Sequence, residues 1–260
     1  MTQKERRIYL IEALIQDMPK YKALRIPKDE PGQQRLLRSL MNVRPPYPVT
    51  EKFLEVQDAY LSERVAERGI TDARTLKASK ASDRIFLWQG DITTLKCDAI
   101  VNAANSALLG CFQPCHDCID NIIHTFSGVQ LRLKCNEIMQ AQGHEERTGT
   151  AKITPGYNLP CRYILHTVGP IVYGRVTKRD CELLTGCYRS CLDLAVENGV
   201  HSIAFCCIST GVFHFPQEKA AAIAVETVAD FLKKDRTIEQ VIFNVFTNKD
   251  LEIYRGLLER

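Results

Sequence analysis

Residues 101–124, VNAANSALLGCFQPCHDCIDNIIH, connect two runs of different character through a loop rich in cysteine and histidine. The run CDAIVNAA, which ends at Ala104, has the composition of a buried strand, and the run IDNIIHTF, which begins at Ile119, has helical spacing. A strand that leads through a loop into a helix is the repeating unit of α/β folds, and ligands bind at such loops. The stretch therefore predicts both a fold class and the place of a ligand site.

The chain from Ile85 onwards repeats this alternation of short apolar runs and longer amphipathic runs. The expected strands are IFLWQ (85–89), AIVNAA (99–104), RYILHTV (162–168), SIAFCCI (202–208) and QVIFNVF (240–246). The expected helices cover residues 118–142, 181–197, 217–234 and 250–258. Continuously apolar strands that alternate with helices predict a three-layer α/β/α fold, with a mostly parallel central sheet covered on both faces.

The first 80 residues have helical spacing and no convincing strand. Three helices are expected: one with an apolar face of Ile8, Ile11, Leu14 and Ile15, one over residues 33–41, and one from a Thr50 cap to about Glu67. Pro45-Pro46 stops the second helix and Gly69 ends the third. We expect residues 1–80 to form a helical N-terminal extension packed on a core domain of residues 81–260. An arm that binds a partner protein is the alternative.

Composition and charge argue against several classes of protein. The 260 residues are 45% hydrophobic and 25% charged, as in globular chains that bury a core. A net charge of +3 is too small to predict binding to nucleic acid. No apolar run is long enough to predict a membrane helix, and acidic residues interrupt the apolar patch near the N-terminus, so no signal peptide is expected. Eleven cysteines without a secretion signal indicate reduced thiols and a cytoplasmic protein, while the oligomeric state stays open.

Three loops that follow expected strands carry polar groups. The carboxylate of Asp91, in the segment GDIT, can accept hydrogen bonds from an exocyclic amine or a ribose hydroxyl, although a helix cap explains it equally well. The turn at 209–213, STGVF, can cradle phosphate oxygens with its backbone N–H groups, and Gly211 allows close approach. An ordinary strand-to-helix turn is the alternative. Asn102 and Asn105 offer amide groups to sugar hydroxyls or cap their own loop.

The loop between Gly110 and the next helix also carries soft metal ligands. Cys111, His116 and Cys118 supply two thiols and an imidazole, and three protein ligands leave one coordination position open, as in catalytic zinc sites. The spacing is also compatible with a closed structural site in which Cys115 is the fourth ligand, or with thiols that hold no metal.

Four segments together resemble a macrodomain of the MacroD type, a module that binds and hydrolyses ADP-ribose derivatives. The segments are QGDIT (89–93), DAIVNAANSALLG (98–110), TGTAKITPGYNLP with RYILHTVGP (148–170), and ISTGVFHFP (208–216). The usual members of this group follow the NAAN segment with a glycine run and Val-Asp-Gly, whereas this chain has GCFQPCHDCIDN. That loop and the helical extension are similar to the zinc-containing macrodomains of bacteria and fungi, in which a Cys, a His and a Cys bind the metal.

The resemblance implies a role for particular residues in binding ADP-ribose. Asp91 would bind the adenine amino group, with Ile92 beside it, and Asn105 would contact the distal ribose. The loop that wraps the diphosphate and the distal ribose would consist of Ser209, Thr210, Gly211, Val212 and Phe213. Asn244 and Tyr254 would close the adenine side.

The resemblance also implies an activity. Cys111, His116 and Cys118 would hold Zn²⁺ near the distal ribose, and Asn105 and Asp120 would be the catalytic residues, with Asp120 positioning water. The expected function is a zinc-dependent hydrolase that removes mono-ADP-ribose from modified protein side chains. A reader that binds ADP-ribose without turnover and a deacetylase of O-acetyl-ADP-ribose are the alternatives. The expected partners are ADP-ribose and mono-ADP-ribosylated protein, with no nucleic acid and no membrane.

Overall fold

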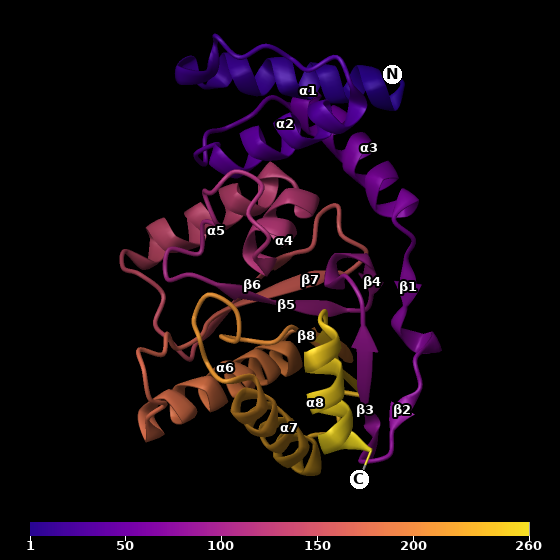
Figure 1. Ribbon diagram of the computed structural model, residues 1–260, viewed down its shortest axis with the longest axis vertical. Helices are drawn as coiled ribbons and strands as arrows, with labels where there is room; N and C mark the ends of the chain where they lie inside the picture. Colours follow the sequence, from indigo (N-terminus) through magenta and orange to yellow (C-terminus); the bar gives the residue numbers. More distant parts are fainter. Residues whose placement is uncertain (260) are drawn as a thin grey trace.

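A seven-stranded sheet lies between two layers of helices in the computed structural model, which describes residues 1–259 (Figure 1). The strands, in their order across the sheet, are β2 (Ala78–Ser79), β3 (Ser82–Gln89), β9 (Gln240–Val245), β8 (Ser202–Phe205), β5 (Ala99–Ala104), β7 (Tyr163–Val168) and β6 (Ala151–Pro155). All pairings from β3 to β7 are parallel, and the two edge strands are antiparallel to their neighbours. The three-layer α/β/α fold with a mostly parallel sheet is confirmed.

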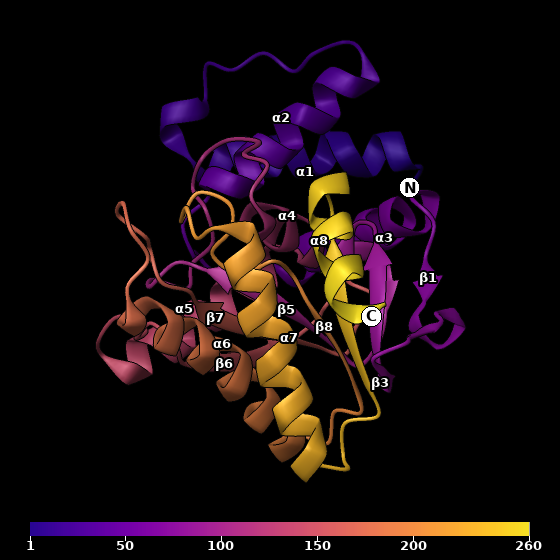
Figure 2. The same cartoon turned by 60° about the horizontal axis from the view of Figure 1, so that its bottom comes forward.

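Helices cover both faces of this sheet. On one face lie α4 (Ile119–Ser127) and α5 (Val129–Gln142), and on the other lie α6 (Lys178–Glu197), α7 (Gln217–Lys234) and α8 (Asn248–Leu258). Figure 2 shows α7 and α8 side by side in front of the sheet. This double covering explains why the strands are apolar throughout: Ala99, Ile100 and Val101 of β5 are 0% exposed although their side chains alternate between the two faces.

The N-terminal extension consists of α1 (Gln3–Asp17), α2 (Glu30–Val43) and α3 (Glu51–Glu67), which lie against α4 and α5 at the top of Figure 1. Thr50 caps α3 by accepting a hydrogen bond from the Phe53 N–H, as predicted. The three helices share an apolar cluster separate from the core around the sheet, and Val129 of α5 belongs to it. Within residues 1–259, no helix is both long and apolar enough to cross a bilayer.

The structure differs from the expected elements at several places. The single helix expected over residues 118–142 is two helices, because Gly128 has φ +96°, which side-chain-bearing residues rarely adopt. Residues 1–80 do contain strands, since β2 pairs with β3, and β1 (Thr71–Asp72) pairs with β4 (Leu95–Lys96). Strand β6, inside the segment 148–170, had no predicted counterpart, because it is not an apolar run: three of its five residues are partly buried and its last residue, Pro155, is exposed.

Candidate active site

A cavity of about 530 Å³ lies where the loops after β3, β8 and β9 meet the start of α4. The carboxyl ends of parallel strands lie at one edge of a sheet, so these loops converge although they are far apart in the chain. Val212 and Phe246, which line the cavity, are 60% and 75% exposed. The cavity therefore reaches the protein surface.

Most of the residues that the sequence assigns to ADP-ribose lie together at this cavity. The lining includes Asp91, Ile92, Ser209, Thr210, Gly211, Val212, Phe213 and Asn244. Two of the expected metal ligands, His116 and Cys118, line it as well. Asn105, Asp120 and Tyr254 are not among the lining residues, and Tyr254 is buried with its ring centroid 5.0 Å from that of Phe243.

Asp91 caps a helical turn, which confirms the helix-cap interpretation, and it also lines the cavity. One carboxylate oxygen, Oδ1, accepts hydrogen bonds from the N–H of Thr93 at 2.9 Å and from its hydroxyl at 2.6 Å. The other oxygen, Oδ2, pairs with the guanidinium of Arg68, at the end of α3. The carbon Cζ of Arg68 lies 3.8 Å from the centroid of the Phe126 ring. The sequence did not indicate that Arg68 belongs to this site.

The loop at 209–213 presents donor groups at the cavity that have no protein acceptor within residues 1–259. Ser209 has φ +65°, and its buried hydroxyl has no hydrogen-bond partner among the described residues. In the same part of the chain, the backbone N–H groups of Gly211, Val212 and Phe213 donate to no backbone carbonyl. Gly169 faces this loop, and a Cβ there would lie 2.0 Å from the Ser209 hydroxyl, so a larger residue would require the Ser209 side chain to move. Donors of this kind can bind phosphate oxygens.

The three predicted metal ligands come together. The ligand atoms of Cys111, His116 and Cys118 lie within 4.8 Å of one another, and the Cys111 Sγ is 3.6 Å from the His116 Nδ1. Burial raises the pKa of the Cys118 thiol to about 12, and a divalent cation would shift it back towards thiolate. Two thiols and an imidazole at this spacing fit zinc. Cys115 lies outside the group, because its Sγ is 3.1 Å from the Ser39 hydroxyl on α2.

Asp120, on α4, is buried and accepts hydrogen bonds from two asparagine side chains. It is 4% exposed, and burial raises the pKa of its carboxyl to about 6. Its Oδ1 accepts a hydrogen bond from the Asn102 amide at 2.8 Å, and its Oδ2 accepts one from the Asn105 amide at 3.4 Å. Asp120 is therefore placed to orient Asn105.

A buried cluster of His124, Cys135 and His166 lies next to these groups. Both nitrogens of His166 are hydrogen-bonded: Nδ1 is 3.1 Å from the Asn102 amide and Nε2 is 2.9 Å from the Thr154 hydroxyl. Burial lowers the pKa of His166 to about 3, so the ring is neutral. His166 was hidden in the sequence because it interrupts an apolar strand run without any ligand-like spacing.

Known proteins resemble this chain along almost all of its length. The Macro domain family matches residues 101–224. A protein-ADP-ribose hydrolase from Treponema medium is 60% identical over 260 residues, which is 99% of this chain and 100% of the relative. A second protein-ADP-ribose hydrolase, from Staphylococcus aureus strain MSSA476, is 52% identical over 258 residues, 99% of this chain and 96% of the relative.

Solved structures agree with the sequence relatives. A Trypanosoma brucei macrodomain in complex with ADP-ribose has a TM-score of 0.65 and 31% identity, covering 85% of this chain and 94% of that chain. The sheet order, the cavity at the strand ends and these similarities lead to one conclusion. The chain belongs to the macro domain family.

Proposed function

We propose that this chain is a zinc-dependent hydrolase that removes mono-ADP-ribose from modified protein side chains. One observation carries the proposal: His116 and Cys118, two of three converging soft ligands, line the same cavity as Asp91 and the 209–213 loop. Relatives that match over nearly the full length are named protein-ADP-ribose hydrolase, which supports the reaction type. Reduced thiol ligands also favour the cytoplasm as its location.

In this proposal, ADP-ribose lies along the cavity from Asp91 to the metal loop. The adenine amino group donates to Asp91, and Ile92 packs beside the base. The diphosphate accepts hydrogen bonds from the N–H groups of Gly211, Val212 and Phe213, which donate to no backbone carbonyl among the described residues. The distal ribose then lies near Asn105.

Reaction at the distal ribose depends on how the chain holds that sugar. Cys111, His116 and Cys118 would hold the zinc ion, which when bound supplies a Lewis acid or lowers the pKa of bound water. Asn105 orients the ribose by hydrogen bonding, and the carboxylate of Asp120 fixes the Asn105 amide. Asp120 thus acts as a positioning residue.

The test compares Cys118→Ala and His116→Ala with Cys115→Ala, which changes the same loop outside the ligand group. We expect the first two proteins to bind no zinc, because one metal ligand is missing. Their rate of ADP-ribose release should be at least about 100-fold lower than that of the wild type. Cys115→Ala should keep both. Metal content, ADP-ribose release from mono-ADP-ribosylated protein and thermal unfolding are measured on each protein. Wild-type turnover in folded, metal-free variants would refute the role of zinc.

A further inference from the structure

Helix α2 of the N-terminal extension makes direct contact with the metal loop, residues 111–118. The Nη2 of Arg38 donates to the His116 carbonyl oxygen at 2.7 Å and to the Asn121 Oδ1 at 3.1 Å. The Oδ1 of Asn42 accepts a hydrogen bond from the Cys115 N–H at 2.9 Å. Two side chains of α2 therefore hold the backbone of the loop at successive residues.

Asn121, on α4, connects Arg38 to the other two ligands. It is 0% exposed, and its Nδ2 donates to the Cys111 carbonyl oxygen at 3.3 Å and to the Gln113 carbonyl oxygen at 2.8 Å. Its backbone N–H lies 3.4 Å from the Cys118 Sγ. Arg38 and Asn121 together contact the backbone or the sulfur of all three predicted ligands.

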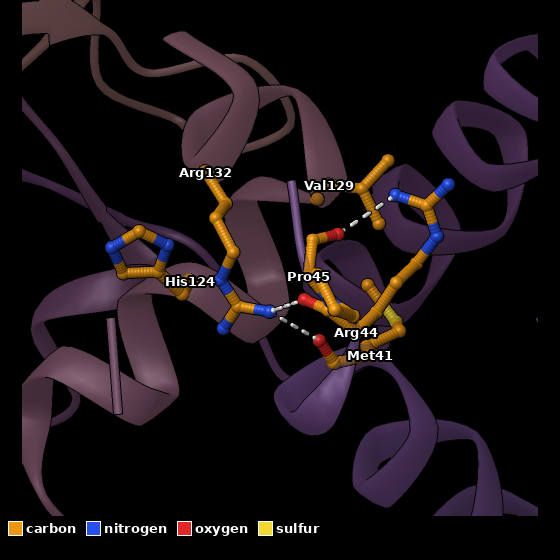
Figure 3. Close-up of a pocket in the computed structure, with 7 residues that line it drawn as sticks. Met41, Arg44, Pro45, His124, Val129 and Arg132 are labelled. Carbon is orange, nitrogen blue, oxygen red and sulfur yellow. Dashed lines mark hydrogen bonds between the residues drawn. The ribbon is translucent and has the colours of Figure 1, made fainter. Parts of the chain in front are cut away.

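Arg132, on α5, links the segment just before the loop to the same extension, and Figure 3 shows its contacts with Met41 and Arg44. Its Nη1 donates to the carbonyl oxygens of Met41 at 2.9 Å and Arg44 at 2.5 Å, at the end of α2. Its Nε donates to the Leu109 carbonyl oxygen at 2.6 Å. The chain is thus tied to the end of α2 two residues before the loop, in addition to the contacts of α2 at Cys115 and His116.

We infer that Arg38 and Asn121 are positioning residues that preorganise the metal ligands, which makes the N-terminal extension a structural part of the metal site. The loop contains no helix or strand, so its own backbone does little to hold the three ligands together. Side chains behind metal ligands commonly set affinity by fixing ligand orientation. The inference rests on the proposed metal site.

The test measures zinc affinity of the full chain by competition with a colorimetric chelator, and the absorption spectrum of the cobalt(II) form. Arg38→Met removes the guanidinium and keeps the aliphatic stem. We expect zinc affinity to fall by about 10- to 100-fold and the cobalt spectrum to change, with partial recovery in Arg38→Lys. Asn121→Ala should act in the same direction. Thermal unfolding of the metal-free proteins shows whether they are folded.

Arg6→Met is the matched control, because Arg6 on α1 pairs with Glu63 at 2.7 Å, and none of its hydrogen bonds within residues 1–259 reaches the loop. It should bind zinc like the wild type. If both Arg38→Met and Asn121→Ala had the zinc affinity and the cobalt spectrum of the wild type, the positioning role would be refuted and the proposed metal site would stand. Failure of the wild-type protein to bind zinc would overturn the metal site together with this inference.

Discussion

Asp91 is a carboxylate that stabilises the local fold and also lies at the cavity. Its Oδ1 accepts a hydrogen bond from the Thr93 N–H, and its Oδ2 forms an ion pair with Arg68. Asp91 is also one of the residues that line the cavity. A carboxylate that accepts a hydrogen bond from the adenine amino group would discriminate adenine from hypoxanthine, which lacks that group.

We expect Asp91→Ala to lower the affinity for ADP-ribose by roughly 10- to 100-fold, because a hydrogen bond to a charged group is worth about 1.5–3 kcal/mol. The affinity for the analogue with hypoxanthine should fall much less. Calorimetric titration with both ligands measures the two changes. Asp72→Asn, which alters an ion-paired carboxylate outside the cavity, serves as the control. Equal losses for both ligands would contradict the assignment of Asp91 to the amino group.

His166 should make the fold sensitive to acid. Its pKa is about 3 in the folded state and 6.5 in the unfolded chain, so below pH 6.5 the unfolded chain binds a proton that the native state does not. The contribution of this titration to the free energy of unfolding is fully present above pH 6.5. It falls by about 1.4 kcal/mol per pH unit as the pH is lowered from 6.5 towards 3.

His166→Gln removes that titration. At pH 7 the variant should be less stable than the wild type by about 1–3 kcal/mol, because buried hydrogen bonds are lost. At pH 5 the difference should shrink by about 2 kcal/mol, which urea unfolding at the two pH values measures. His201→Gln, at an exposed histidine, is the control. A difference that stays constant between pH 7 and pH 5 would contradict the buried, neutral state of His166.

At the scale of elements, the start of the metal loop depends on Gly110. It has φ +81°, and a Cβ at this position would lie 2.8 Å from the ring of His124. Gly199 has φ +62° with nothing within 4 Å of a built Cβ, so it shares the backbone conformation without the close approach.

Gly110→Ala should therefore destabilise the protein more than Gly199→Ala. The positive φ angle costs each alanine variant about 1–2 kcal/mol of unfolding free energy. For Gly110→Ala, the close contact with His124 costs roughly 1–3 kcal/mol more. Urea unfolding of the two variants and the wild type gives both values. Equal losses would show that the loop moves away from His124 without cost.

Much of this element-scale organisation is readable from the sequence. The helix over Gln217–Lys234 and the Thr50 cap match their predictions, because apolar spacing and capping residues act over a few positions. The three candidate ligands could be grouped because they lie in one short loop. Arg38 and Arg68 could not, since their partners Asn121 and Asp91 lie 83 and 23 residues away. Only the folded chain shows these pairs.

At the scale of the whole molecule, the extension and the macrodomain share buried polar contacts. Gln57 of α3 is 0% exposed, accepts a hydrogen bond from the Val129 N–H at 2.9 Å and donates to the Gln130 Oε1 at 2.7 Å. Separation would leave these polar groups in water and would remove Val129 from the apolar cluster of the extension. The proposed boundary near residue 80 therefore separates segments of sequence that we expect to unfold together.

This expectation can be measured with the single tryptophan of the chain, Trp88 on β3, which reports on the sheet. Circular dichroism at 222 nm reports on all helices, including the extension. We expect the two urea unfolding curves of one sample to coincide, as in a two-state transition. Helix loss at lower urea than the change in tryptophan fluorescence would show that the extension unfolds on its own.

The ion pair between Arg68 and Asp91 joins the extension to the cavity, and this has a thermodynamic consequence. A ligand that engages Asp91 changes the interaction that Arg68 makes with it, and so changes the free energy with which α3 is held against the macrodomain. Such coupling is reciprocal. If the docked extension increases the affinity for the ligand by some factor, the bound ligand stabilises the docked position of the extension by the same factor.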